Sequence, residues 1–319
     1  MLLYPEAPWV PELYSDMTPK RIIVIISLII SLAVSGSDPA WADSRIVAIQ
    51  TLKVPPYEAA LQGAQSLFRQ SFTYVDLADL PDADIQADLR ISNAKLILAV
   101  GTNALTAARN IRNIPVVYIM ALHPENIVNG ATNITGVDLV IPPDIQLTAL
   151  LKIIPSIQSV GLLYDPSQTG LLQQKAASAS EGLNLQLRSA PVYSANQVPD
   201  LLKNLRSQID IFWMVPDLTV VRPETVEFQL LFSIENKIPI LTFSEKYLKL
   251  GALVSISADP YDMGRQAGEM ARRILNGTPV QSIPGTDART PVISVNPRVA
   301  AKLGIHLDGK VLNEVNMVE

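Results

Sequence analysis

The sequence predicts an α/β fold made of two Rossmann-like lobes, each with a parallel, doubly wound sheet. From Arg45 onward, short apolar runs alternate with amphipathic stretches of helical periodicity. The runs are apolar at consecutive positions, which is typical of parallel strands buried on both faces. The series is interrupted at Pro142 and Pro143 and then begins again. About ten strands are many for one open sheet, so the repeated series favours two sheets.

The expected strands are short and bounded by Gly, Pro, Asn or Asp. They span residues 46–50, 96–100, 116–120, 160–164, 211–215, 240–243 and 252–256. The expected helices between them span residues 57–70, 103–109, 144–154, 171–181, 197–208, 223–236 and 261–275. Strand–helix–strand units at this spacing imply right-handed crossovers. The extended run 133–141, followed by two prolines and a new helix near Asp144, indicates a hinge.

The N-terminal region carries the pattern of an export signal. Lys20 and Arg21 precede an apolar run over residues 22–34, and Ala40-Trp-Ala42 gives the small-x-small pattern of a signal-peptidase site. The apolar run is shorter than the roughly 20 residues that a helix needs to cross a bilayer. We therefore expect a cleaved signal and a mature chain that begins near Asp43 in the periplasm. A retained membrane anchor is the alternative, which the helix-breaking residues 35–39 disfavour.

Composition limits the classes of partner. The chain of 319 residues is 48% hydrophobic. The 277 residues after position 42 are therefore enough to form a sizeable apolar core. It has 25 basic and 30 acidic residues and no basic stripe, which disfavours nucleic acid as a partner. Because cysteine is absent, the export signal is not followed by a lipid-modified cysteine. We expect a free product that needs no metal or cofactor.

Ligands of open α/β sheets bind at the carboxyl ends of the strands, so these positions are the candidate site. After the strand at 96–100 come Gly101, Thr102 and Asn103 and then a helix, an arrangement that can bind a carboxylate or phosphate. The alternative is an ordinary strand-to-helix turn with a good cap.

In the second half of the chain the strand ends are acidic. Each acid alone is most often a turn residue or helix cap, but four at equivalent positions suggest a site for a cationic group. Together with an anion site on the other lobe, they indicate a zwitterion such as an amino acid. The polar candidates are Asp165, Ser167, Asp217, Ser244, Glu245 and Asp259. Apolar walls are expected from Tyr57, Tyr118, Met120, Tyr164 and Phe243.

Catalytic constellations are scarce. His123 and His306 lie far apart, and neither has an obvious partner in the sequence. No zinc-hydrolase, nucleophile-elbow, phosphate-loop or dinucleotide motif occurs. The inventory favours binding over catalysis, so we expect a protein that is not an enzyme.

Several segments of the chain match the pattern of a known family. They include Val100-Gly-Thr-Asn-Ala104, Asn133-Ile-Thr-Gly-Val137 and Val160-Gly-Leu-Leu-Tyr-Asp-Pro-Ser167. Further matching segments span residues 113–118, 150–155, 237–240, 251–255, 262–275 and 293–305, so the likeness runs in order over nearly all of residues 45–310. On these segments the chain resembles the solute-binding proteins of ABC importers, in the group associated with aromatic amino acids.

The resemblance implies a type I periplasmic-binding fold whose two lobes are joined by three crossings and close on a solute. It implies a first lobe of residues 43–138 plus 251–278 and a second of 139–250 plus 279–319. It also implies an ABC permease and its cytoplasmic ATPase as partners. The chain departs from the family pattern at Thr51–Tyr57, a loop that touches the solute in the family. Lys53 there is expected to pair with a solute carboxylate or a cleft acid, or to be a solvated loop residue.

Three functions compete at this point. Capture of a small solute for an ABC importer, by hinge closure, is the function that the pattern favours. A periplasmic sensor of the same fold that acts on a signalling partner is the alternative. An exported α/β enzyme is disfavoured because no nucleophile constellation is present.

Overall fold

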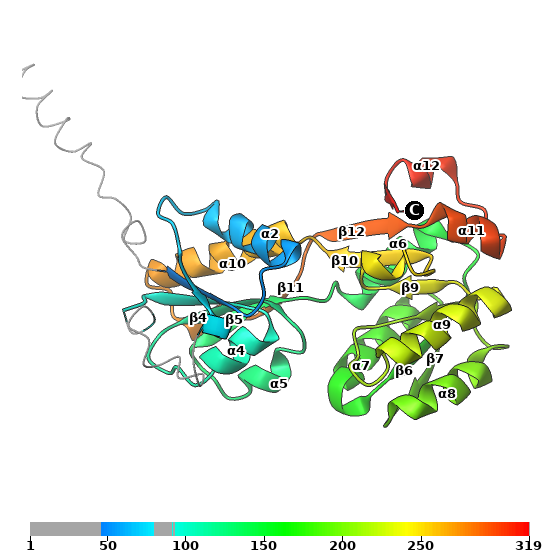
Figure 1. The fold of residues 1–319 in the computed structure, drawn as a ribbon, viewed down its shortest axis with the longest axis horizontal. Helices are drawn as coiled ribbons and strands as arrows, with labels where there is room; N and C mark the ends of the chain where they lie inside the picture. The colour runs from blue at the N-terminus through cyan, green and yellow to red at the C-terminus, as the bar shows by residue number, and fades with distance from the viewer. Residues whose placement is uncertain (1–45, 80–90, 92, 319) are drawn as a thin grey trace, which may run out of the picture. The chain divides into compact units, whose positions relative to one another are not determined.

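The computed structural model describes residues 46–79, 91 and 93–318, and the expected signal at 20–42 lies outside the described residues. Two sheets organise the chain (Figure 1). The first has the order β11-β5-β4-β3-β1-β2 and the second the order β13-β12-β10-β9-β8-β6-β7. The predicted pair of doubly wound sheets is therefore confirmed.

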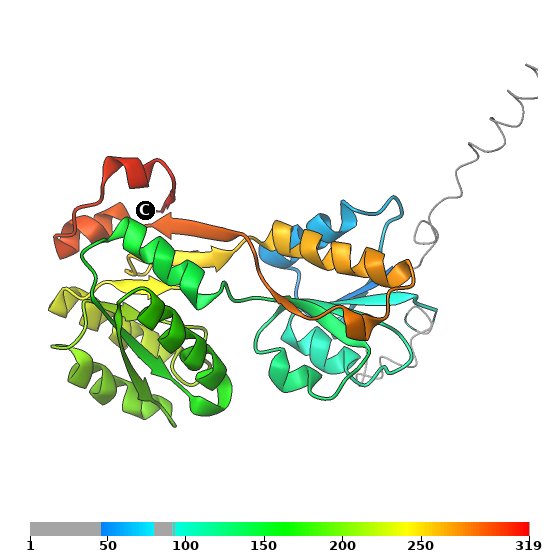
Figure 2. The same cartoon turned by 180° about the vertical axis from the view of Figure 1, so that it is seen from behind.

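The first sheet is parallel throughout its described pairs. Its strands are β1 (Ile46–Gln50), β2 (Thr73–Asp76), β3 (Leu96–Val100), β4 (Val116–Ala121), β5 (Ile134–Asp138) and β11 (Thr286–Asp287). Its helical segments are α2 (Pro55–Gln65), η2 (Leu77–Asp79), α4 (Thr102–Ala108), α5 (Glu125–Val128), α10 (Pro260–Leu275) and η7 (Val280–Ser282). Figures 1 and 2 show α2 and α10 over one face of this sheet, with α4 and α5 over the other. Every residue of β1 and β3 is buried, as their unbroken apolar runs predict.

Helices α2 and α10 pack closely because small residues line their contact. A Cβ atom on Gly63 would lie 1.9 Å from the carbonyl oxygen of Tyr261, and one on Gly264 would lie 1.8 Å from that of Ala60. Any side chain at either position would force the helices apart. Since α10 is far from α2 in sequence, this contact ties a late segment of the chain to the first sheet.

The second sheet is built mainly from the middle of the chain. Its strands are β6 (Ser159–Tyr164), β7 (Gln186–Pro191), β8 (Ile211–Trp213), β9 (Ile240–Thr242), β10 (Val254–Ala258), β12 (Pro291–Val295) and β13 (Asn316–Met317). Its helical segments are α6 (Pro143–Ile153), α7 (Pro166–Gly182), η5 (Ala195–Gln197), α8 (Val198–Leu205), α9 (Pro223–Asn236), η6 (Glu245–Tyr247), α11 (Pro297–Leu303) and α12 (Gly309–Leu312). Helices α6 and α7 cover one face, and α8 and α9 cover the other (Figures 1 and 2). Strand β12 runs antiparallel to β10, which departs from the expected all-parallel sheet.

Two strands lie in a different sheet from the one that the expected lobe boundaries gave them. Strand β10, expected in the first lobe, pairs with β9 and β12 of the second sheet. Strand β11, expected in the second lobe, pairs with β5 of the first. Sheet membership changes three times along the chain, after Asp138, between β10 and α10, and between β11 and β12.

Within the part of the chain that the structure describes, no helix combines the length and the apolar character needed to span a membrane.

Candidate functional site

A cavity of about 430 Å³ lies at the carboxyl ends of several strands. It receives residues from the first turn of α2, the end of β4, the segment after β5, the loops after β8 and β9, and strands β10 and β12. The lining residues are Pro56, Met120, Leu139, Val140, Ile141, Gln146, Pro216, Phe243, Ser244, Glu245, Ile256, Ser257, Ala258, Pro260 and Val292. Most of them are apolar, and the volume is that of a small-molecule site.

Met120 reaches the cavity through an irregularity of β4. Its φ is +57°, and the pairing of β4 with β5 shifts register between Tyr118 and Ala121. Such a bulge bends the strand and redirects a side chain. A left-handed backbone at a non-glycine residue is strained, and this kind of strain is common at binding sites.

Glu245 gives the cavity its charge. It begins η6, directly after β9, and one of its carboxylate oxygens accepts a hydrogen bond from the hydroxyl of Ser294. Among the described lining residues, it alone carries a formal charge. The hydroxyls of Ser244 and Ser257 line the same cavity and have no hydrogen-bond partner among the described residues. The cavity therefore offers one carboxylate and two hydroxyls in an apolar wall.

Gln146 also lines the cavity, but its amide is already bonded. The Nε2 group donates to the carbonyl oxygen of Ile141 at 2.7 Å, and Oε1 accepts from Trp213 Nε1 at 3.2 Å. Gln146 thus holds the segment after β5 against the second sheet.

Asp217, a predicted partner for an ammonium group, is hydrogen-bonded within its own lobe. Its side chain is 1% exposed and does not line the cavity. Oδ1 accepts from the backbone amides of Thr219 and Val220, while Oδ2 accepts from the amide of Asp165 and the hydroxyl of Thr169. Four donors occupy both oxygens, so the carboxylate organises the turn after β8.

Asp165 and Ser167 form the start of α7. The Asp165 carboxylate accepts from the amide and hydroxyl of Ser167 and from the hydroxyl of Thr219 at 2.6 Å. Burial alone would raise the pKa of Asp165, but these hydrogen bonds hold it below the ordinary value. Asp259 is the equivalent cap of α10, accepting from the amides of Tyr261 and Asp262. None of the three lines the cavity.

At the first sheet, Tyr57 covers the predicted anion turn. Gly101 has φ +91°, and a Cβ there would lie 2.4 Å from the Tyr57 hydroxyl oxygen. The Thr102 hydroxyl accepts from the amide of Leu122 at 2.9 Å, and Asn103 is exposed. The helix that follows has seven residues. These groups do not line the cavity, so their contact with a solute stays a prediction.

The remaining candidates also lie outside the cavity lining. The Lys53 ammonium is 3.8 Å from Asp76 Oδ2, and its side chain is 67% exposed. Thr51 is half-buried in the same loop, and Tyr164 is half-buried at the end of β6. Of the predicted polar residues, the cavity brings together Ser244 and Glu245, and it adds Met120 and Phe243 as apolar wall.

Gln50 is a residue that the sequence reasoning missed. It ends β1, is 5% exposed, and its Oε1 has no partner among the described residues. A buried acceptor without a donor is costly, but Gln50 does not line the 430 Å³ cavity. The signal was a polar residue that ends an otherwise apolar strand.

His123 has partners that the sequence did not reveal. One ring nitrogen lies 3.5 Å from the Glu125 carboxylate, and the other lies 3.1 Å from the carbonyl oxygen of Pro216, a cavity residue. Burial lowers the pKa of His123, but the bonds to Glu125 and Pro216 outweigh burial and raise it. The Pro216 partner lies 93 residues away in the chain.

Asp138 lies beside this group, where the chain leaves the first sheet. The Tyr118 hydroxyl donates to its Oδ1 at 2.7 Å. Burial, with smaller contributions from Asp287 and Glu125, raises the pKa of Asp138 to about 6. Burial and the Asp138 charge also raise the pKa of Tyr118.

Two sheets joined by three crossings, with a mostly apolar cavity at the strand ends, define a two-lobed ligand-binding protein. A family model described as "ABC transporter substrate binding protein" matches residues 75–319. The chain therefore belongs to the ABC transporter substrate-binding protein family.

Two curated relatives match parts of the chain. The tyrosine-binding protein of Clostridioides difficile is 24% identical over 228 residues, which are 68% of this chain and 66% of that protein. An uncharacterized protein of Rickettsia prowazekii is 25% identical over 63% of this chain and 64% of its own length. The chain thus spans about two thirds of the length of these curated relatives.

Solved structures share the fold. The ligand-free, open structure of a Clostridium difficile substrate binding protein with adhesive properties matches with a TM-score of 0.70 and 20% identity. A Streptococcus pneumonia domain in complex with L-Trp matches with a TM-score of 0.61 and 20% identity. Each match covers 86% of this chain and 99% of the other.

Proposed function

We propose that this protein binds an amino acid with an apolar or aromatic side chain and delivers it to an ABC importer. The observation that carries the proposal is the lone carboxylate of Glu245 in an otherwise uncharged, largely apolar cavity of about 430 Å³. An ammonium group bound there gains a charge-assisted hydrogen bond with Glu245. Burial of the amino acid's side chain in the cavity removes apolar surface from contact with water, which also favours binding.

The walls suit a ring or branched chain. Met120, Phe243 and Ile256 contribute apolar surface, and Met120 adapts to irregular shapes. The Ser244 and Ser257 hydroxyls are available to the solute carboxylate. We propose that the first lobe contacts the solute through the turn formed by Gly101, Thr102 and Asn103. We propose the same for Thr51 and Lys53 in the loop after β1.

Hinge closure is the proposed mechanism. The three segments that pass between the sheets, near residues 139–142, 259 and 288–290, are the proposed hinges. A solute shifts the equilibrium toward closure only through contacts that it makes in the closed form alone. We propose that the closed form docks on a membrane permease whose ATPase drives import.

The proposed location is the periplasm. The pattern Lys20–Ala42 supports export with cleavage after Ala42, and membership in the substrate-binding family supports work outside the cytoplasm. We propose a monomer, since each lobe must present a face to the permease.

The test is calorimetric titration of the exported chain with a panel of amino acids, supported by thermal unfolding. An amino acid at about 100 times its dissociation constant adds about 2.7 kcal/mol of stability, a shift of several degrees. Saturable binding of tyrosine, tryptophan, phenylalanine or leucine, with weaker binding of aspartate and lysine, is the expected result. Tighter binding of aspartate than of any apolar amino acid would refute the proposal, because Glu245 would repel it.

A further inference from the structure

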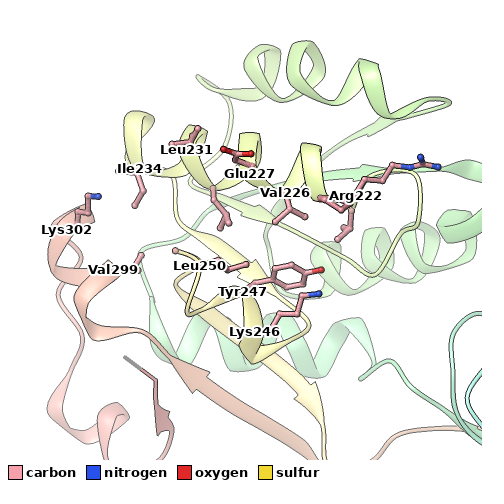
Figure 3. A pocket seen from close by; sticks show the side chains of 14 residues that line it. Arg222, Val226, Glu227, Leu231, Ile234, Lys246, Tyr247, Leu250, Val299 and Lys302 are labelled. Atoms are coloured by element: carbon pink, nitrogen blue, oxygen red, sulfur yellow. The ribbon is translucent and has the colours of Figure 1, made fainter. Parts of the chain in front are cut away.

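A second and larger cavity lies within the second lobe, between α9 and the segment that follows η6. Its volume is about 760 Å³, and it shares no lining residue with the 430 Å³ cavity. Figure 3 shows it as a groove with α9 on one side and Tyr247 and Leu250 on the other. Val299 and Lys302 of α11 close one end.

Helix α9 supplies a wall with a charged start and an apolar body. Arg222, the cap of α9, is followed at steps of four by Val226, Leu230 and Ile234, all of which line the groove. Residues four apart lie on one face of a helix, so these side chains form a single row. With a rise of 1.5 Å per residue, the row is about 18 Å long.

The facing wall is also apolar. Tyr247 is buried, and Leu250 is 59% exposed to solvent. Leu231, on the α9 side, is 55% exposed. Exposed leucines around a groove of this size mark a surface that gains stability when it is covered.

The charges around the groove are mainly positive. Arg222, Lys246 and Lys302 line it, against one carboxylate, Glu227. Among the described residues none of the three cations has an ion-pair partner within 4.0 Å, and the Lys246 ammonium lies 4.9 Å from the centre of the Tyr247 ring. Figure 3 shows Arg222 and Lys246 toward one end of the groove and Lys302 at the other.

We propose that this groove is a second ligand site, which binds an amphiphilic anion, an unbranched apolar chain that ends in a carboxylate. The carboxylate binds at the end of the groove that carries Lys246 and Arg222 (Figure 3), and the chain runs along Val226, Leu230 and Ile234 toward Val299. Two cations at one end of the apolar row, against one at the other, favour this orientation of the molecule (Figure 3). The volume lies within the range of small-ligand sites, which are mostly apolar with a few polar groups that fix orientation.

Calorimetry of the purified chain with sodium decanoate as the probe tests the proposal. We expect saturable binding of one decanoate that persists when the amino-acid site is saturated. Decanol and decylammonium have the same chain without the anion, and we expect both to bind at least about tenfold more weakly.

Substitutions locate the site. Lys246→Glu and Leu250→Asp place negative charge on the groove, so each should weaken decanoate binding about tenfold or more. The matched controls are Lys249→Glu and Leu171→Asp, exposed residues that do not line it, and these should bind like the unmodified chain. Unchanged thermal unfolding of the variants shows that the fold is intact.

Three results would overturn the proposal. If decanoate competes with the amino acid, it occupies the 430 Å³ cavity and not the groove. If decylammonium binds as tightly as decanoate, the negative charge of the probe has no role. Binding of an acidic amphipathic peptide without any binding of decanoate would assign the groove to a protein partner. Each result leaves the proposed amino-acid function untouched, because that function is measured at the other cavity.

Discussion

Asp217 and Glu245 follow neighbouring strands of one sheet, yet their carboxylates have opposite surroundings. Asp217, after β8, accepts four hydrogen bonds from its own lobe and is 1% exposed. Glu245, after β9, accepts one from Ser294 and lines the 430 Å³ cavity. The difference lies in the number of donors that the second lobe places around each carboxylate. A carboxylate whose two oxygens are both occupied by donors of its own lobe stabilises the fold, whereas one with few donors is available to bind a cation.

The largest effect should come from Asp217→Ala. Removal of the carboxylate leaves the amides of Thr219, Val220 and Asp165 without an acceptor, and buried unpaired donors cost about 3 kcal/mol or more in total. Urea unfolding measures the loss. Asp217→Asn retains one acceptor oxygen and should lose less stability. A variant as stable as the unmodified chain that no longer binds amino acid would contradict the assignment and place Asp217 in the site.

Glu245→Gln should change affinity for the amino acid more than stability, the reverse of Asp217→Ala. The amide keeps the shape and an acceptor for Ser294 but loses the charge, so affinity for the amino acid should fall about tenfold or more. The free energy of unfolding should change by less than about 1 kcal/mol, as for a partly exposed group. Glu235→Gln, an exposed residue of α9 outside both cavities, is the matched control. Equal calorimetric affinity for the two variants would exclude Glu245 as the ammonium site.

Asp138 is an intermediate case, a half-buried carboxylate that accepts a hydrogen bond from Tyr118. Burial raises its pKa to about 6, so the folded state binds the proton more tightly than the unfolded state does. The free energy of unfolding should therefore fall as pH rises from about 4 through 6, with a contribution of up to about 3 kcal/mol. Asp138→Asn should remove this dependence and be the more stable protein above pH 6.

Thermal unfolding of both proteins at several pH values checks the Asp138 prediction. The difference between the two proteins isolates Asp138, because His123, whose pKa is also raised, is present in both. A difference that does not vary between about pH 4 and 7 would show that Asp138 keeps an ordinary pKa.

The sequence predicted the elements whose apolar pattern is continuous. The strands at 46–50 and 96–100 and the helix at 223–236 have the predicted bounds. Each buries side chains that the sequence marks by an apolar run, for a strand, or by apolar residues at helical spacing, for a helix. It missed β7, which is polar and lies at a sheet edge, β11 and β13, which have two residues each, and also β2 and β12. Each of these strands depends on pairing with a strand elsewhere in the chain, which no local pattern encodes.

The site was less predictable for the same reason. The sequence placed Asp217 and Glu245 at strand ends, but two of the four donors around Asp217 come from Asp165 and Thr169, about 50 residues away. Met120 was expected as apolar wall, yet its left-handed backbone depends on the register of β4 against β5. The sequence thus shows which residues lie at strand ends. It does not show whether the acceptor oxygens of a carboxylate are already hydrogen-bonded to donors from distant parts of the chain.

The smallest effect should come from Lys53→Ala, in the loop that departs from the family pattern. Lys53 lies 3.8 Å from Asp76 and is largely exposed, and exposed ion pairs contribute about 0.2–1 kcal/mol. Unfolding in urea should therefore hardly change. The affinity for amino acid decides the role of the loop. If Lys53→Ala lowers the affinity about fivefold, and high salt lowers the affinity of the unmodified chain by a similar factor, Lys53 pairs with the solute carboxylate. An unchanged affinity would leave it as the partner of Asp76, and the carboxylate would then depend on uncharged donors such as Ser244 and Ser257.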